Sequence, residues 1–72
     1  MATLRPIKRK DLVNRLRQLG FTGPYAGGKH EYMQRDRLKV HIPNPHQGDI
    51  SVALLRHILE EADVSLQKWE QL

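Results

Sequence analysis

Residues 30–42 read HEYMQRDRLKVHI, and this stretch predicts the fold because it holds two strand patterns joined by a turn. The first pattern runs from His30 to Gln34, and Arg35-Asp36 is the expected turn. The second runs from Arg37 to Ile42 and alternates without a break. Its apolar and basic residues fall on opposite faces: Leu38, Val40 and Ile42 on one, Arg37, Lys39 and His41 on the other. This alternation predicts a sheet with one face on a core and the other exposed and basic.

The segment before these strands predicts an amphipathic helix from Lys8 to Leu19. Its apolar residues recur at the spacing of one helix face: Leu12, Val13, Leu16 and Leu19. Gly20 stands where a left-handed C-terminal cap is expected, and Phe21 follows as the apolar residue that packs back on the helix. Residues 22–28 are rich in Gly and Pro, so we expect them to hold at most a short edge strand.

The segment after the strands predicts one further helix and a short last one. Leu55, Ile58, Leu59 and Ala62 form an apolar stripe in a helix from about Ser51 to Ala62, with Asp49 or Ser51 as N-cap. A short helix is expected after Ser65, where Leu66 and Trp69 can reach the core. The expected fold is therefore one α+β domain over residues 1–72. Two amphipathic helices pack on one face of a small antiparallel sheet of two or three strands, and the opposite face stays open.

The composition limits the kind of chemistry that the chain can perform. It has 72 residues and no cysteine, which excludes disulfides, thiolate metal sites and a thiol nucleophile, and fits the reducing cytoplasm. No apolar run reaches the roughly 18 residues of a membrane span, and no signal peptide is expected. The net charge of +4 favours polyanions or acidic partners. Chemistry in so small a domain must use an open face or a shallow groove.

The stretch Gly27-Gly28-Lys29-His30 is the first candidate site. Two glycines permit a tight turn or close approach of a ligand, and histidine is the side chain best suited to exchange protons near neutral pH. From the spacing alone, an exposed histidine at the start of a strand is the more frequent outcome for so short a motif. The remaining histidines are His41, His46 and His57. They have neither helical i, i+4 spacing nor a cysteine partner, so no metal ion and no cofactor is expected.

Basic residues suggest a second property, the binding of phosphates. Lys29, Arg37, Lys39 and His41 are expected on or beside the open sheet face, and Gly28 beside Lys29 lets a phosphate approach the backbone. The first helix adds Lys8 and Lys10. Only one aromatic residue, Tyr32, is expected near this face, so phosphate contact is better supported than base stacking. The alternative is that these cations merely form a solvated surface.

Four segments resemble the HicA family of bacterial toxins. The family has a helix ending in Gly-Phe, a Gly-x-His strand start, a strand ending in aliphatic-Pro-x-x-His, and a closing helix. This chain has Gly20-Phe21, Gly28-Lys29-His30, Ile42-Pro43-Asn44-Pro45-His46 and the helical run at 54–59, in that order, and the similarity spans nearly all of residues 5–72. The resemblance implies an α-β-β-β-α fold like that of double-stranded-RNA-binding domains. It also implies metal-independent cleavage of messenger RNA, with His30 as the catalytic histidine and a HicB-like antitoxin as partner.

Three positions depart from the family pattern, and two other functions stay open. Lys29 stands where most members have Ser or Thr, Glu31 where a second His is frequent, and Ala53 where Gly is common. One alternative is a non-catalytic RNA-binding module, although the helix start Ser51-Val52-Ala53 lacks the lysine cluster of double-stranded-RNA binders. The other is a protein-interaction domain that uses the same surface for an acidic partner.

Overall fold

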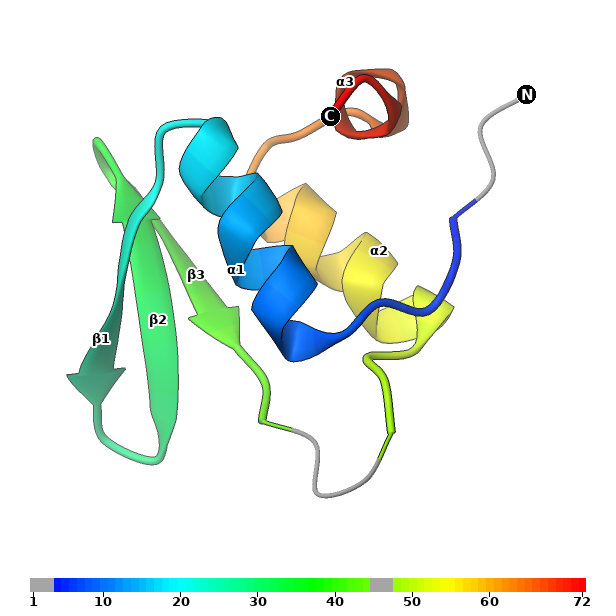
Figure 1. Ribbon diagram of the computed structural model, residues 1–72. Helices are drawn as coiled ribbons and strands as arrows, with labels where there is room; N and C mark the ends of the chain where they lie inside the picture. Colours follow the sequence, from blue (N-terminus) through cyan, green and yellow to red (C-terminus); the bar gives the residue numbers. More distant parts are fainter. Residues whose placement is uncertain (1–3, 45–47) are drawn as a thin grey trace.

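The computed structural model describes residues 4–44 and 48–72 (Figure 1). Along the chain the elements are α1 (Arg9–Gln18), β1 (Thr22–Gly27), β2 (His30–Arg35), β3 (Leu38–Ile42), α2 (Val52–Glu61) and α3 (Leu66–Glu70). The predicted α+β fold, with the order α-β-β-β-α, is confirmed, and α3 is the expected short last helix. In these ranges no helix is long and apolar enough to cross a membrane.

The three strands form one antiparallel sheet in the order β1-β2-β3, so β2 is the central strand. The register pairs Met33 with Val40 and Tyr32 with His41. Because side chains alternate along a strand, these two pairs lie on opposite faces. Met33 and Val40 are fully buried, so their face is the core face. The alternation predicted for the last strand is therefore confirmed from Leu38 to Ile42.

Helices α1 and α2 cover one face of the sheet and leave the other face without a helix (Figure 1). Between the two layers lies one apolar core, which includes the following residues: Leu12, Leu16, Phe21, Met33, Val40, Ile42, Ile50, Leu55, Ile58, Leu59 and Trp69. Trp69 of α3 docks on this core as expected, and Leu66 packs at its margin. Each buried Leu or Ile contributes about 1.5–3 kcal/mol relative to an exposed one, which makes this core the main source of stability.

The C-terminal end of α1 is held by backbone and side-chain hydrogen bonds. Gly20 adopts a φ of +96°, and the N–H of Phe21 donates to the carbonyl of Leu16 at 3.0 Å. The guanidinium of Arg35 donates to the carbonyl of Leu19 at 2.8 Å and lies 4.8 Å from the Phe21 ring centroid. The predicted glycine cap is therefore present, and an arginine from the sheet reinforces it.

The turn between β2 and β3 lies one residue later than predicted. Arg35 belongs to β2 because its side chain is engaged at the end of α1, and the turn consists of Asp36 and Arg37. Asp36 has a φ of +52°, a conformation that Asp tolerates better than most residues. The prediction that Arg37 begins a strand was wrong, and β3 starts at Leu38.

Strand β1 is longer than the short strand expected from its Gly and Pro content. It occupies an edge of the sheet, as predicted, and its register shifts between Thr22 and Tyr25, where Gly23 and Pro24 form an irregularity. An edge strand tolerates Pro at such a position. Arg17 of α1 donates two hydrogen bonds to the carbonyl of Gly23, at 3.1 and 2.8 Å. The helix thus supplies a partner for a carbonyl at the irregular part of the strand.

Serine residues cap the two C-terminal helices. The Oγ of Ser51 accepts a hydrogen bond from the N–H of Leu54 at 3.2 Å, and the Oγ of Ser65 accepts one from Lys68 at 3.1 Å. Of the two N-caps proposed for α2, Ser51 is therefore the correct one. Ahead of it, Ile50 forms an antiparallel bridge with Ile7, which brings the segment before α1 beside the segment before α2.

Candidate nucleic-acid interface

His30 is the first residue of β2, directly after a two-residue hairpin turn. It pairs with Gly27 across the turn, which consists of Gly28 and Lys29. Gly28 has a φ of +77°, the sign that tight hairpin turns require and glycine adopts without strain. His30 is exposed, and no hydrogen bond or ion pair of its side chain occurs within residues 4–44 and 48–72. Its imidazole is therefore accessible to a ligand.

The residue after His30 is held by a contact from α1. Arg9 forms an ion pair with Glu31, and its Nε donates to the carbonyl of Pro43 at 3.2 Å. One guanidinium thereby joins the start of α1, the start of β2 and the chain just beyond β3. We call the place where these three segments meet, together with the turn at Gly28 and Lys29, the hairpin end.

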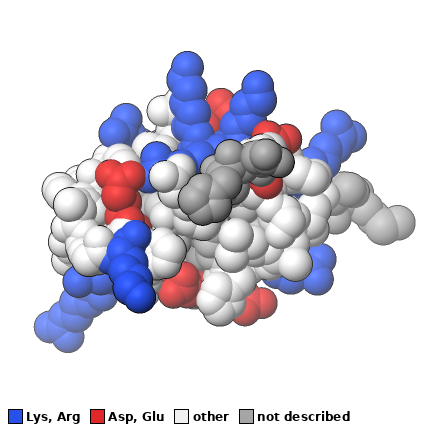
Figure 2. Space-filling model, turned by 90° about the horizontal axis from the view of Figure 1, so that it is seen from below, with Lys and Arg blue, Asp and Glu red and all other residues white. Residues whose placement is uncertain are grey.

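Three lysines belong to the hairpin end. Lys29 is in the turn itself, while Lys8 is the N-cap of α1 and Lys10 lies in its first turn. All three are exposed. Figure 2 views the molecule from this end, and Lys and Arg side chains project around the rim of the face it shows, with Asp and Glu between them. The hairpin end therefore carries an exposed histidine, an exposed lysine in the adjacent turn and two exposed lysines at the start of α1.

Two tyrosines and a lysine form a cluster on the open sheet face. Tyr25 of β1 pairs in register with Tyr32 of β2, and their ring centroids are 5.5 Å apart with a 45° angle between the planes. The ammonium of Lys39 on β3 lies 4.5 Å from the centroid of the Tyr32 ring. Tyr25 is 45% exposed. We call Tyr25, Tyr32 and Lys39 the tyrosine cluster.

Tyr25 was not predicted to lie on this face, and the expectation of one aromatic residue near it was wrong. The Gly and Pro residues around Tyr25 predicted only a short strand, so the sheet face of the Tyr25 side chain could not be predicted. The signal that could have identified it is the spacing to the turn. A two-residue turn after Gly27 places Tyr25 opposite Tyr32. Two aromatic rings on the open face make base stacking a mode that the surface can support.

The remaining candidates lie at different distances from the hairpin end. His41 shares the open face with Tyr32 by register, and its Nδ1 lies 4.0 Å from a carboxylate oxygen of Glu61 on α2. Lys39 is two residues away on the same strand. Arg37 lies in the turn at the opposite end of β2 from His30, so the structure does not bring these two residues together.

The other histidines add no metal site to this description. His57 is exposed on α2, and His46 lies outside the described residues. In the part of the chain that the structure describes, no three His, Asp or Glu side chains gather as metal ligands do.

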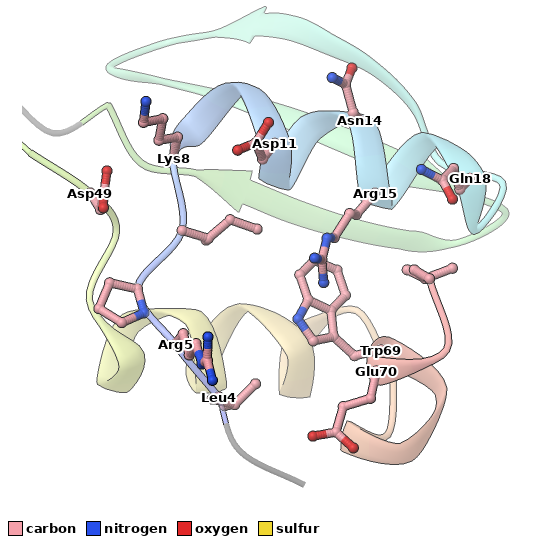
Figure 3. A pocket seen from close by; sticks show the side chains of 13 residues that line it. Leu4, Arg5, Lys8, Asp11, Asn14, Arg15, Gln18, Asp49, Trp69 and Glu70 are labelled. Atoms are coloured by element: carbon pink, nitrogen blue, oxygen red, sulfur yellow. The ribbon is translucent and has the colours of Figure 1, made fainter.

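A hollow elsewhere on the molecule contains none of the predicted site residues except Lys8. It lies between the segment before α1, α1 itself and α3, as Figure 3 shows. Arg15 lies over the Trp69 ring in it, 5.1 Å from the centroid. Its charged lining is mixed, with three cations and three carboxylates: Arg5, Lys8, Arg15, Asp11, Asp49 and Glu70. Mixed charge gives this hollow no preference for a polyanion, so the hairpin end and open face are the better candidate for a nucleic-acid interface.

Comparison with known proteins gives one match. The model of a family described as "HicA toxin of bacterial toxin-antitoxin" matches residues 9–64, which run from the start of α1 to beyond the end of α2 and include the hairpin with His30. No curated protein and no solved structure matches the chain.

Proposed function

The chain belongs to the HicA family of toxins from bacterial toxin-antitoxin systems, and on this basis we propose that it is an endoribonuclease that cleaves messenger RNA in the cytoplasm with His30 as its catalytic residue. The observation that carries the proposal is the accessible imidazole of His30 beside a glycine turn. Lysines at the same end of the molecule supply the charge that attracts an RNA backbone.

The proposed reaction uses a nucleophile that the RNA itself supplies. The 2′-hydroxyl oxygen attacks the adjacent phosphorus, the bond from phosphorus to the 5′-oxygen breaks, and a 2′,3′-cyclic phosphate and a 5′-hydroxyl result. His30 either takes the proton from the 2′-hydroxyl or gives a proton to the 5′-oxygen. Such proton transfer contributes about 10²–10⁴-fold to a rate. Neither step requires a metal ion or a cofactor.

The reaction also requires stabilisation of the phosphate charge and exchange of a second proton, and residues near His30 can do both. Negative charge that builds on the phosphate is stabilised by Lys29 and by backbone N–H groups of the turn at Gly28. The second proton is exchanged with His41, Tyr32 or water. Tyr32 lies two residues from His30 on the same face of β2, and His41 is its partner in register on β3.

RNA contact is assigned to the basic residues of the hairpin end and the open face. Lys8, Lys10 and Lys29 would hold phosphates near the cleaved bond, and Lys39 and His41 would hold the strand further along the sheet. Arg37, at the far end of β2, would contact only an RNA long enough to cross the sheet. The second proposed partner is a HicB-like antitoxin that covers the same surface and prevents cleavage.

The test is an RNase assay on purified protein, with His30→Ala as the informative variant. We expect cleavage to fall at least about a hundredfold, the lower value for loss of a proton-transfer group. His57→Ala is a matched control, since it removes another exposed histidine from the helix layer. Both variants should unfold at nearly the wild-type temperature, because exposed substitutions change stability by about 0.5 kcal/mol or less.

The assay also separates the proposal from the two other functions. A folded His30→Ala protein that still cleaves RNA would remove His30 from the mechanism. Wild-type protein that binds RNA without cleaving it would be a binding module, and wild-type protein that does neither would be a protein-interaction domain.

A further inference from the structure

We propose that Tyr25 is a stacking site for an unpaired base of the RNA, next to the phosphate that His30 reaches; this inference rests on the proposed ribonuclease function and specifies its substrate as single-stranded RNA. The starting observation is exposure. Tyr25 and Leu54 are the exposed large apolar side chains in the described residues, and only Tyr25 lies on the sheet.

Tyr32 packs against Tyr25, and its own ring is partly covered by neighbouring residues. The Tyr32 ring lies so close over Gly27 that a Cβ there would come within 2.7 Å of it. The Lys39 ammonium lies over the same ring at 4.5 Å. These neighbours limit the access of a ligand to the Tyr32 ring. The Tyr25 ring centroid lies 5.5 Å from that of Tyr32, and Tyr25 is 45% exposed. Tyr25 is the ring that a base can reach, and Tyr32 is a positioning residue.

The register sets the distance from this ring to the proposed reaction centre. Tyr25 pairs with Tyr32, and Gly27 pairs with His30, so the two pairs are separated by two residues on each strand. Two residues of antiparallel strand correspond to about 7 Å. At that separation, a base on Tyr25 belongs to a nucleotide next to the one whose phosphate lies at His30.

Charge and chemistry favour RNA over a protein as the occupant. The Lys39 ammonium beside the Tyr32 ring can contact a phosphate while a base stacks on Tyr25, and Lys29 adds positive charge in the turn next to His30. Aromatic rings next to cations are the usual arrangement for binding single strands, because every base has a face that can stack. A duplex keeps its bases stacked on one another, so it cannot use Tyr25 in this way.

The experiment measures binding in a His30→Ala background, which keeps the RNA intact. Fluorescence anisotropy compares a labelled single-stranded RNA with a duplex that contains the same strand. The variants are Tyr25→Ala, Tyr25→Phe and Tyr25→Thr, and the last removes the ring while keeping a residue that favours strands. Leu54→Ala is the control, because it removes an exposed apolar side chain from α2. Melting temperatures show which variants are folded.

We expect both non-aromatic variants to weaken single-strand binding about tenfold, as loss of one base–aromatic stack does. Tyr25→Phe and the control should bind as the parent does, and duplex binding should stay unchanged in every variant. Unchanged single-strand affinity in folded Tyr25→Thr would overturn the inference, as would equal losses for single strand and duplex. Loss of antitoxin binding with intact RNA binding would also overturn it and identify Tyr25 as a protein contact.

Cleavage by the wild-type protein is measured separately, so the two proposals can fail independently. If wild-type protein binds single strands through Tyr25 but cleaves none, the ribonuclease proposal fails and the stacking site stands as an RNA-binding site. If wild-type protein cleaves and Tyr25→Thr binds as tightly as the parent, the stacking inference alone fails.

Discussion

Neighbouring glycines in the hairpin meet different physical requirements. A Cβ at Gly27 would come within 2.7 Å of the Tyr32 ring, so this position needs glycine for space. At Gly28 no heavy atom lies within 4 Å of a Cβ, but a φ of +77° strains any other residue. The first requirement depends on the ring of Tyr32 and the second on the backbone alone.

The two glycines should therefore respond differently when Tyr32 is shortened. Gly27→Ala should lower the free energy of unfolding by about 1–3 kcal/mol, as overpacking does, and Gly28→Ala by about 1–2 kcal/mol, the cost of a left-handed residue. In a Tyr32→Ala background the effect of Gly27→Ala should largely disappear, while that of Gly28→Ala should remain. Urea unfolding measures all of these variants. An unchanged cost of Gly27→Ala without the Tyr32 ring would show that space beside the ring is not what the position requires.

At the residue scale, the face of a side chain could be predicted where its strand alternates, and not where the strand is irregular. Lys39 and Val40 were correctly predicted to lie on opposite faces of the sheet, because their strand alternates without interruption. No sheet face could be predicted for Tyr25, because the register shifts at Gly23 and Pro24. The catalytic role of His30 stays a prediction.

At the scale of elements, Arg9 joins α1 to the sheet through two acceptors. It pairs with Glu31 and donates to the carbonyl of Pro43. The Arg9 and Glu31 side chains are 26% and 47% exposed, so the ion pair itself should contribute about 0.2–1 kcal/mol. The hydrogen bond to Pro43 is independent of Glu31 and adds to the effect of Arg9.

We therefore expect Arg9→Ala to destabilise the protein more than Glu31→Ala. A double-mutant cycle should give a coupling free energy of at most about 1 kcal/mol between Arg9 and Glu31. This coupling should decrease at high salt. The measurement is urea unfolding of both single variants and the double variant at two salt concentrations. Equal effects of the two single substitutions would mean that the bond to Pro43 contributes nothing measurable.

Phosphate contact by the strands should make RNA binding depend on salt. If about three to five phosphates are neutralised, log K should fall against log salt with a slope near −0.7 per contact. Lys29→Ala and Lys39→Ala should each reduce the slope by about one contact. Lys68→Ala, an exposed lysine of α3, is the control and should leave the slope unchanged. Binding that is flat between low and physiological salt would exclude this surface as the RNA site.

The order of elements could be predicted because each pattern has its own period, but one boundary depended on tertiary contacts. Arg35 looked like a turn residue by sequence, yet its guanidinium bonds to Leu19 and covers Phe21, and this draws it into β2. The turn therefore consists of Asp36 and Arg37 and not of Arg35 and Asp36. A contact between residues sixteen positions apart cannot be read from a local pattern.

At the scale of the whole molecule, the described residues form two layers and leave one sheet face open (Figure 1). The described part measures 37 × 30 × 17 Å, so the molecule is flattened in one direction. Within that part His30, Tyr25 and Lys39 are exposed. If the proposed ribonuclease site lies on this face, a partner protein is needed to restrain the activity.

The last prediction is that an antitoxin covers this open face. The toxin's net charge of +4 makes an acidic partner favourable, chiefly through a faster association rate. A partner that binds only the folded state should also raise the melting temperature, because it stabilises that state by about 2.7 kcal/mol at a hundredfold excess over Kd. The toxin is co-expressed with a neighbouring open reading frame, and hydrogen exchange is compared between the complex and the free chain. Residues 28–34 and 37–42 should gain protection, and α3 should not. A stable complex in which those strands gain no protection and cleavage continues would show that the partner binds elsewhere and does not occlude the site.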